Sequence, residues 1–181
     1  MENIEAKFPE NPSLKTHKLV LGAQICLRIV AIATALAATW VMLTSKQTVM
    51  VFGIPFDARY SYSSAFKFFA FANALACGFT VLSLLFVFFF SRRGLTPANY
   101  FLLFLHDLLM MSLALSGVAA GTAIGYVGRF GNIHAGWLQI CDRLGKFCHK
   151  VTASLIFSYL SVLCLLVLTI ISASKSRQIK V

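Results

Sequence analysis

Two charged residues, Arg28 and Asp107, stand inside stretches of the sequence that are otherwise almost wholly apolar. A lone charge inside a membrane-spanning helix costs about 2.5–3.5 kcal/mol on insertion scales. Two kinds of chemistry could use the pair. One is a proton or ion relay, with His106 beside the carboxylate and Asn73 lining a path. The other is a buried ion pair that fixes which helices pack together.

The positions of the two charges favour the ion pair. Arg28 lies about ten residues into its apolar run and Asp107 about eight, which corresponds to ~15 and ~12 Å of helix. In an antiparallel bundle the first and third spans start at the same membrane face, so the charges reach nearly the same depth. A conducting path would need polar residues repeated along one face, whereas beyond Asp107 this face turns to Ala and Gly. We therefore expect a structural tie with charge-assisted hydrogen bonds. We expect His106, about 100° around the helix, to be a packed or interfacial residue.

Small residues follow the carboxylate on the same helix face. Gly117, Gly121 and Gly125 form two overlapping GxxxG spacings, which let another helix approach closely. At roughly 100° per residue, Asp107, Gly121 and Gly125 fall within about 40° of one another. We predict that this face looks into a helical bundle, where the glycines and Asn73 serve helix packing.

Two cysteines and two histidines gather in the polar stretch before the last apolar run. Cys141 and Cys148 could form a disulfide, bind zinc together with His134 and His149, or remain free thiols. One straight helix would hold their Cα atoms ~10.5 Å apart, too far for a bridge, but Gly145 offers a place to turn. The spacing matches no familiar zinc pattern. The disulfide is the expected state, and it would contribute about 2–3 kcal/mol by constraining the unfolded chain.

Four long apolar runs must position these residues. The chain is 59% hydrophobic and only 12% charged, with a mean hydropathy of +0.80, whereas soluble domains carry about 25% charged residues. Each run is long enough to cross a ~30 Å hydrocarbon core as a helix. We predict an all-α membrane protein, an antiparallel four-transmembrane-helix bundle within residues 19–173. Its spans are about 19–43, 66–90, 100–124 and 151–172.

The connecting segments are polar. Residues 1–18 are expected to form a disordered tail, and they carry no cleavable signal peptide. A second short tail covers residues 174–181. In the first loop, 44–65, Gly53 and Pro55 break any helix, while the TVMVF sequence could pair as a short strand. The second loop runs from about Tyr126 to Lys150.

The charge pattern bears on orientation and partners. The chain carries 16 Lys and Arg residues against 6 Asp and Glu, a net charge of +10. Outside the spans the basic residues divide almost equally between the two sides, so the positive-inside rule barely decides. A cysteine pair suits the oxidising exterior, which favours cytosolic termini and two extracellular loops. Because the basic residues lie in tails and short loops, they favour contact with anionic membrane lipids and not with nucleic acid.

The arrangement resembles the Casparian strip membrane domain protein-like (CASP-like) family of plants, relatives of the MARVEL tetraspan proteins. The resemblance covers most of the chain, from the first span to the fourth. It is carried by Arg28, by FKFFAFANALA at residues 66–76, by YFLLFLHD ending at Asp107, and by GNIHAGWLQICDRLGKFC in the second loop. The most specific part is a Trp-x₃-Cys…Phe-Cys pattern, onto which fall Trp137, Cys141, Phe147 and Cys148.

The resemblance implies a role. In that family the intramembrane Arg and Asp and the outer-loop Cys pair are characteristic, and the termini face the cytosol. It implies a multi-pass plasma-membrane protein that self-associates and acts as a membrane scaffold, of the subfamily 1 type. The first loop departs from the strip-forming members: QTVMVFGIPFDARYSY replaces their acidic-aromatic ETLPFFTQF-like stretch. A direct part in laying down a Casparian strip is therefore not expected.

The sequence bears on four classes of function: enzyme, scaffold, transporter and adhesion protein. No HExxH, GxSxG, P-loop or GxGxxG motif occurs, so we predict no enzyme, no cofactor and no metal site. The leading hypothesis is a scaffold that oligomerises through small-residue helix faces and outer loops. Its expected partners are copies of itself, as a dimer or a larger assembly, related paralogues and secreted cell-wall enzymes. The alternatives are a small transporter or channel subunit that uses the Arg/Asp pair, and a junction-type adhesion protein.

Overall fold

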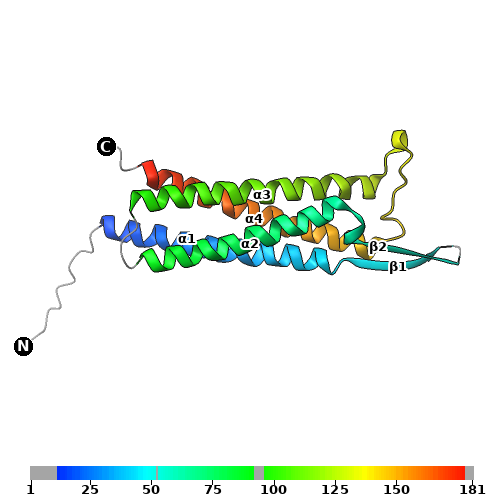
Figure 1. Cartoon of the computed structure of the whole chain (residues 1–181), viewed down its shortest axis with the longest axis horizontal. Helices are drawn as coiled ribbons and strands as arrows, with labels where there is room; N and C mark the ends of the chain where they lie inside the picture. The colour runs from blue at the N-terminus through cyan, green and yellow to red at the C-terminus, as the bar shows by residue number, and fades with distance from the viewer. Residues whose placement is uncertain (1–11, 52, 92–95, 178–181) are drawn as a thin grey trace, which may run out of the picture.

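The computed structural model describes residues 12–51, 53–91 and 96–177 of the 181-residue chain. Its principal elements, in chain order (Figure 1), are α1 (Pro12–Leu43), β1 (Lys46–Val51), β2 (Ile54–Arg59), α2 (Ser64–Ser91), α3 (Pro97–Phe130) and α4 (Gly145–Arg177). Two short 3-10 turns, η1 (Tyr60–Tyr62) and η2 (Ile133–Ala135), lie in the loops. Most of the predicted tails, at residues 1–11 and 178–181, lies outside the described residues.

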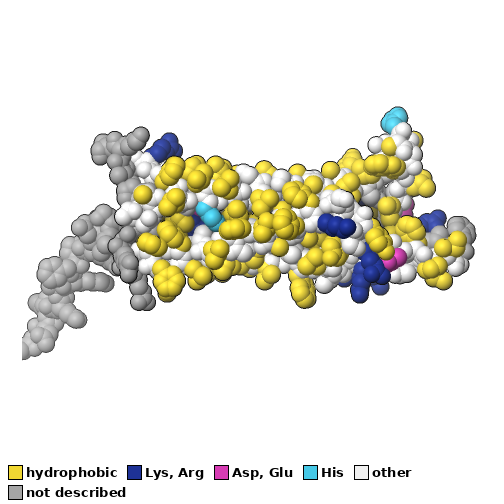
Figure 2. Space-filling view, in the orientation of Figure 1, with side chains coloured by type: hydrophobic (Ala, Val, Ile, Leu, Met, Phe, Trp, Pro, Cys, Tyr) yellow, Lys and Arg dark blue, Asp and Glu magenta, His cyan; other side chains and the backbone are white. Residues whose placement is uncertain are grey.

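The four helices lie side by side along one long axis (Figure 1). Around the bundle α1 contacts α2, α2 contacts α3, α3 contacts α4 and α4 contacts α1, so α1 and α3 lie on a diagonal. Each is long and apolar enough to cross a membrane. Figure 2 shows hydrophobic side chains along the flank of the bundle, with basic side chains toward its ends. The predicted all-α four-span bundle is confirmed.

The helices are longer than the predicted apolar spans, because a helix need not end where the hydrocarbon ends. α1 begins at Pro12, so the expectation of disorder is wrong for residues 12–18. Proline is tolerated there because the first turn of a helix needs no N–H donor. At the other end of the bundle α3 continues to Phe130 and stops at Gly131, whose φ is +70°. A Cβ on Gly131 would lie 2.7 Å from the carbonyl oxygen of Trp137, so only glycine fits this turn.

The first loop holds a two-stranded antiparallel hairpin that extends past the end of the bundle (Figure 1). The pairing runs from Lys46 opposite Arg59 to Val51 opposite Ile54. The strand expected from TVMVF is present. Its partner was not expected, because it contains Pro55, and proline normally demotes a strand. In a two-stranded ribbon each strand has one open edge. A proline is tolerated there when the position of its missing N–H faces that edge, because no hydrogen bond between the strands is lost.

The core of the bundle combines aliphatic, aromatic and small side chains. A Cβ on Gly117 would lie 2.8 Å from the Cβ of Ala72 on α2, and a Cβ on Gly121 would lie 3.0 Å from Leu155 of α4. The glycine face of α3 is therefore used inside this chain, against α2 and α4, as the sequence predicted. Gly117 and Gly121 are both buried within one chain, so neither is available for a contact between copies.

Candidate functional site: a buried polar cluster across the bundle

The central polar contact joins α1 to α3 across the diagonal of the bundle. Arg28 donates from Nη1 to Oδ1 of Asp107 over 2.8 Å and from Nη2 to Oδ2 over 2.9 Å. Both side chains are 0% exposed. Two parallel charge-assisted hydrogen bonds match the flat guanidinium to the flat carboxylate, which is the strongest geometry for such a pair. The structure thus brings together the two charges that the sequence singled out.

Two serines extend this contact to the remaining helices. Ser83 of α2 accepts a hydrogen bond from Nη1 of Arg28, and its hydroxyl also lies 3.1 Å from the carbonyl oxygen of Thr80. Ser172 of α4 donates to Oδ2 of Asp107 over 3.4 Å. Each of the four helices therefore contributes one side chain to the cluster. Sequence reasoning missed both serines, because a lone Ser in an apolar run gives no signal of its partner.

His106 lies closer to the cluster than the sequence suggested. Its Nδ1 is 3.3 Å from Oδ1 of Asp107, although neighbouring residues on a helix point about 100° apart. The imidazole ring is long enough to lean back toward the carboxylate. The side chain is 25% exposed, so it stands at the edge of the cluster. The expectation of an interfacial residue agrees with this exposure, but the contact with Asp107 was not anticipated.

Several buried polar atoms near the ion pair have no hydrogen-bond partner among the described residues. They are both side-chain polar atoms of Gln24, Nε of Arg28 and Nε2 of His106. Gln24 lies one turn before Arg28 on α1 and is fully buried, and sequence reasoning did not identify it. A glutamine four residues before a buried arginine was the available signal, since both fall on one helix face.

Farther toward the loops the bundle is joined by neutral hydrogen bonds. Asn73 of α2 donates to the carbonyl oxygen of Phe69 and accepts a 2.8 Å hydrogen bond from Ser158 of α4. On the same helix Ser154 donates to the carbonyl oxygen of Ala38 over 2.7 Å. Asn73 thus packs helices together, as predicted, and is not near the ion pair. The serines of α4 repeat at helical spacing, a signal that sequence reasoning did not use.

The second loop is closed by a disulfide. Cys141 and Cys148 are bonded, with their Cα atoms 5.7 Å apart. This approach is possible because α4 begins at Gly145, so the two cysteines do not share one straight helix. Both thiols are used in the bridge, which removes them from the free-thiol and zinc hypotheses. His134 and His149 are exposed.

The two motif aromatics of this loop behave differently. Phe147 packs edge-on against Phe66 with ring centroids 6.2 Å apart, and its N–H donates to the side chain of Gln47 over 2.8 Å. This hydrogen bond connects the start of α4 to the hairpin. Trp137 pairs by its backbone with Asn132, while its side chain is 56% exposed. Phe147 therefore anchors the loop, and Trp137 presents an aromatic surface.

The hairpin carries its own ion pair outside the bundle. Arg59 donates from Nε to Oδ2 of Asp57 over 2.7 Å, and Thr48 and Tyr62 also donate to this carboxylate. The hydrogen bond from Arg59 is the main cause that lowers the pKa of Asp57. Because the carboxylate is the form these donors stabilise, the hairpin favours a charged Asp57.

The sequence model of the Casparian strip membrane protein domain matches residues 17–164, a range that includes the ion pair and the disulfide. The chain belongs to this family. The resemblance drawn from the motifs of the spans and the second loop is confirmed.

CASP-like relatives are similar over nearly the whole chain. A CASP-like protein 1F1 of Vitis vinifera is 60% identical over 181 residues, which are 100% of this chain and 88% of the relative. A CASP-like protein 1F2 of Populus trichocarpa is 55% identical and covers 100% of both chains. A CASP-like protein 1F1 of Arabidopsis thaliana is 41% identical over 93% of this chain and 97% of the relative. No solved structure matches. The four apolar helices and the CASP-like family together identify a multi-pass membrane protein.

Proposed function

We propose that this CASP-like chain is a scaffold of the plasma membrane, with both termini in the cytosol. It associates laterally with copies of itself or with related chains to form membrane platforms. Its outer loops, held by the disulfide and by the contact between Phe147 and Gln47, provide the surface on which secreted cell-wall enzymes dock. The family to which the chain belongs supports this proposal at the level of a membrane protein, and the arrangement of its polar residues supports the finer role.

The observation that carries the proposal is the use of the buried polar groups. One side chain from each helix enters the cluster around Arg28 and Asp107, and a second contact joins Asn73 to Ser158. These contacts hold the helices in one arrangement. A transporter needs alternative arrangements or a polar path, and the charges of this bundle neutralise one another in a fully buried position. The geometry therefore favours a rigid scaffold over a small transporter or channel subunit.

A face for lateral association lies on the outside of α3. Small residues repeat there at intervals of four, three and four residues, and all of them are exposed: Ser112, Ser116, Ala119 and Ala123. Small residues on a lipid-facing helix let a second backbone approach closely, which drives association where no hydrophobic effect operates. This face is the candidate contact between copies.

Single-molecule photobleaching of a tagged full-length chain in plant plasma membrane tests the proposal. The double change Ser116→Leu and Ala119→Leu should shift assemblies toward monomers, because the added side chains separate the two helices. Ala33→Leu on α1 is the matched control, since Ala33 is also exposed. Monomers only in the unmodified chain, or equal assembly in all variants, would contradict self-association through this face.

Ion or solute flux in reconstituted liposomes separates the scaffold from the transporter. We expect no flux above protein-free liposomes. Flux that is lost in Asp107→Asn, with assembly unchanged, would instead establish transport through the cluster.

A further inference from the structure

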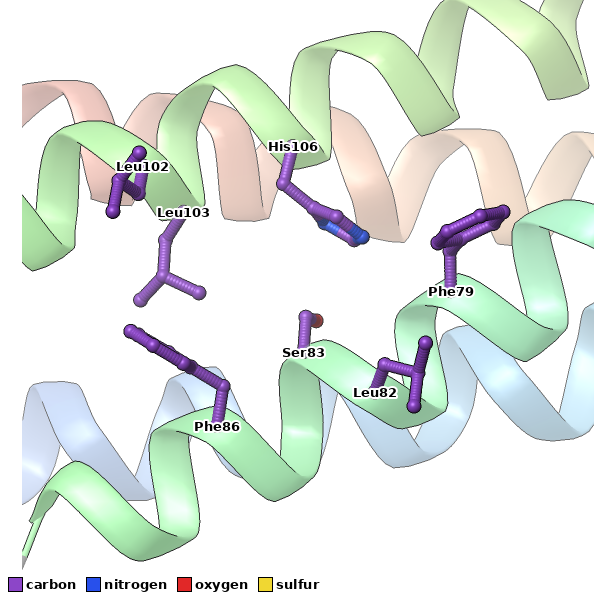
Figure 3. A pocket seen from close by; sticks show the side chains of 7 residues that line it. All are labelled: Phe79, Leu82, Ser83, Phe86, Leu102, Leu103 and His106. Atoms are coloured by element: carbon purple, nitrogen blue, oxygen red, sulfur yellow. The ribbon is translucent and has the colours of Figure 1, made fainter.

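A groove of about 300 Å³ lies between α2 and α3, beside the buried ion pair (Figure 3). Its walls are apolar, with the rings of Phe79 and Phe86 on α2 and the side chain of Leu102 on α3. Leu102 is 56% exposed, so the groove opens sideways from the bundle toward the lipid. In Figure 3 Ser83 and His106 face the space between the two helices. These two residues supply the polar groups of the groove.

Only one of the two polar residues is free to bind a ligand. Ser83 already accepts from Arg28 and lies within hydrogen-bonding distance of the carbonyl oxygen of Thr80. By contrast, Nε2 of His106 is buried and has no partner among the described residues. A buried polar atom without a partner is costly, particularly next to hydrocarbon, where water does not supply the missing bond. A ligand in the groove could therefore supply the hydrogen-bond partner that Nε2 of His106 lacks.

The other ring nitrogen decides what this group must be. Nδ1 of His106 lies 3.3 Å from Oδ1 of Asp107, and a carboxylate can only accept, so Nδ1 carries the proton. In this tautomer Nε2 of His106 has a lone pair, which requires a hydrogen-bond donor.

Depth in the membrane limits the ligand further. His106 lies six residues beyond Tyr100, where the apolar run begins, which places it about 9 Å along the helix from that point. A phosphate-bearing headgroup would have to leave water to reach this level, at a high cost. A single hydroxyl can enter more easily, because one hydrogen bond satisfies its donor. A lipid whose only polar group is a hydroxyl therefore suits this depth best.

We propose that this groove binds a membrane sterol, whose hydroxyl donates to Nε2 of His106. The flat fused rings pack between Phe79 and Phe86, and the rest of the molecule lies along the exposed side chains of α2 and α3. A rigid body loses less conformational freedom on binding than a two-chain lipid does, which favours the sterol over diacylglycerol.

Photolabelling of the full-length chain in phosphatidylcholine vesicles tests this site. The probe is a sterol with a free 3-hydroxyl and a diazirine, and mass spectrometry locates the adduct. We expect adducts on the groove-lining residues of α2 and α3, from Phe79 on one helix to His106 on the other. Unlabelled sterol should displace the probe, while its 3-O-methyl ether, which cannot donate, should compete at least tenfold more weakly. Equal competition by the ether would overturn the proposal, as would stronger competition by diacylglycerol or a free fatty acid.

Two variants examine the residues separately. His106→Phe removes the acceptor, and Leu102→Trp fills the opening while leaving the contact between His106 and Asp107 intact. Each should lower labelling at least tenfold. Leu109→Trp is the matched control, because Leu109 lies on the same helix and is also 56% exposed but does not line the groove. Undiminished labelling in Leu102→Trp, or an equal loss in the Leu109→Trp control, would show that the sterol does not occupy this groove.

Discussion

The bundle interior and the hairpin each contain an Arg–Asp ion pair, and the two pairs are nearly identical in length. Arg28 and Asp107 are 2.8 Å apart inside the bundle, and Arg59 and Asp57 are 2.7 Å apart on the hairpin. The first pair is 0% exposed on both sides, while the second is 55% and 27% exposed. From these distances alone, the two pairs would be expected to contribute equally to stability.

The difference in burial gives the two pairs different roles. On the hairpin, water can replace either partner, so the exposed pair adds little to the free energy of unfolding. Inside the bundle nothing can replace a lost partner, and removing one leaves an uncompensated charge at a typical cost of 3–5 kcal/mol. The buried pair therefore decides which arrangement of helices is possible, and the hairpin pair only adjusts a local turn.

Breaking the buried pair should have the largest effect. Arg28→Asp alone and Asp107→Arg alone each place two like charges together, and we expect a loss of at least ~3–5 kcal/mol in the free energy of unfolding. The two changes together restore opposite charges, so the double variant should fold better than either single variant. Denaturant unfolding in detergent and the yield of membrane-inserted protein measure the difference.

The double variant also controls for the substitutions themselves. If both single variants express, localise and unfold like the unmodified chain, the ion pair does not tie the helices. Recovery should be incomplete, because Ser83 and Ser172 are placed for the original arrangement.

Replacing glycines by alanine tests an uncharged contact, and we expect a smaller loss of stability than from breaking the buried ion pair. Gly117→Ala forces a Cβ to within 2.8 Å of Ala72, and overpacking of this kind typically costs 1–3 kcal/mol. Gly78→Ala is the matched control on α2, since nothing lies within 4 Å of its new Cβ. Its stability should be unchanged or slightly raised, because alanine favours the helix. Equal effects on the unfolding midpoint would mean that close approach of α2 and α3 is unimportant.

Loss of the hairpin ion pair should have the smallest effect on stability, and it should occur only at acidic pH. Its donors lower the pKa of Asp57, so the stabilisation is present above the unfolded value of about 3.9 and is lost as the pH falls through the lowered folded value. Order in the hairpin should therefore be constant from neutral pH to about 4 and decrease below it. NMR amide shifts of the hairpin measure this, with Asp57→Asn as the comparison. A midpoint above the ordinary aspartate value would contradict the sign of the shift.

Sequence reasoning reached the ion pair because its evidence was strong and local. A charge inside an apolar run must find a partner, and only one acid and one base lie at matching depths. The disulfide followed from similar reasoning, since Gly145 allowed the chain to turn between the two cysteines. The same reasoning failed for β2, because it contains a proline and was therefore not predicted to be a strand. It also failed for residues 12–18, because their polar composition indicated disorder although they form the first turns of α1.

The residues that surround the ion pair were beyond such reasoning. Ser83, Ser172 and Gln24 are ordinary polar residues in apolar runs, and the chain contains many others. Which of them faces a distant charge depends on the rotation of each helix about its axis. That rotation is set by the packing of all four helices together.

The sequence by itself determined the number of spans, the family, and the need for Arg28 and Asp107 to meet. Hydrocarbon imposes the spans and the pairing of the charges, because it penalises any unpaired charge and admits only long apolar helices. The family followed from the sequence motifs. Only the tertiary structure decided that Ser83 and Ser172 join the ion pair, that His106 reaches the carboxylate, and that a groove opens beside it. These outcomes depend on the relative rotation and approach of helices far apart in the sequence, where many weak contacts act at once.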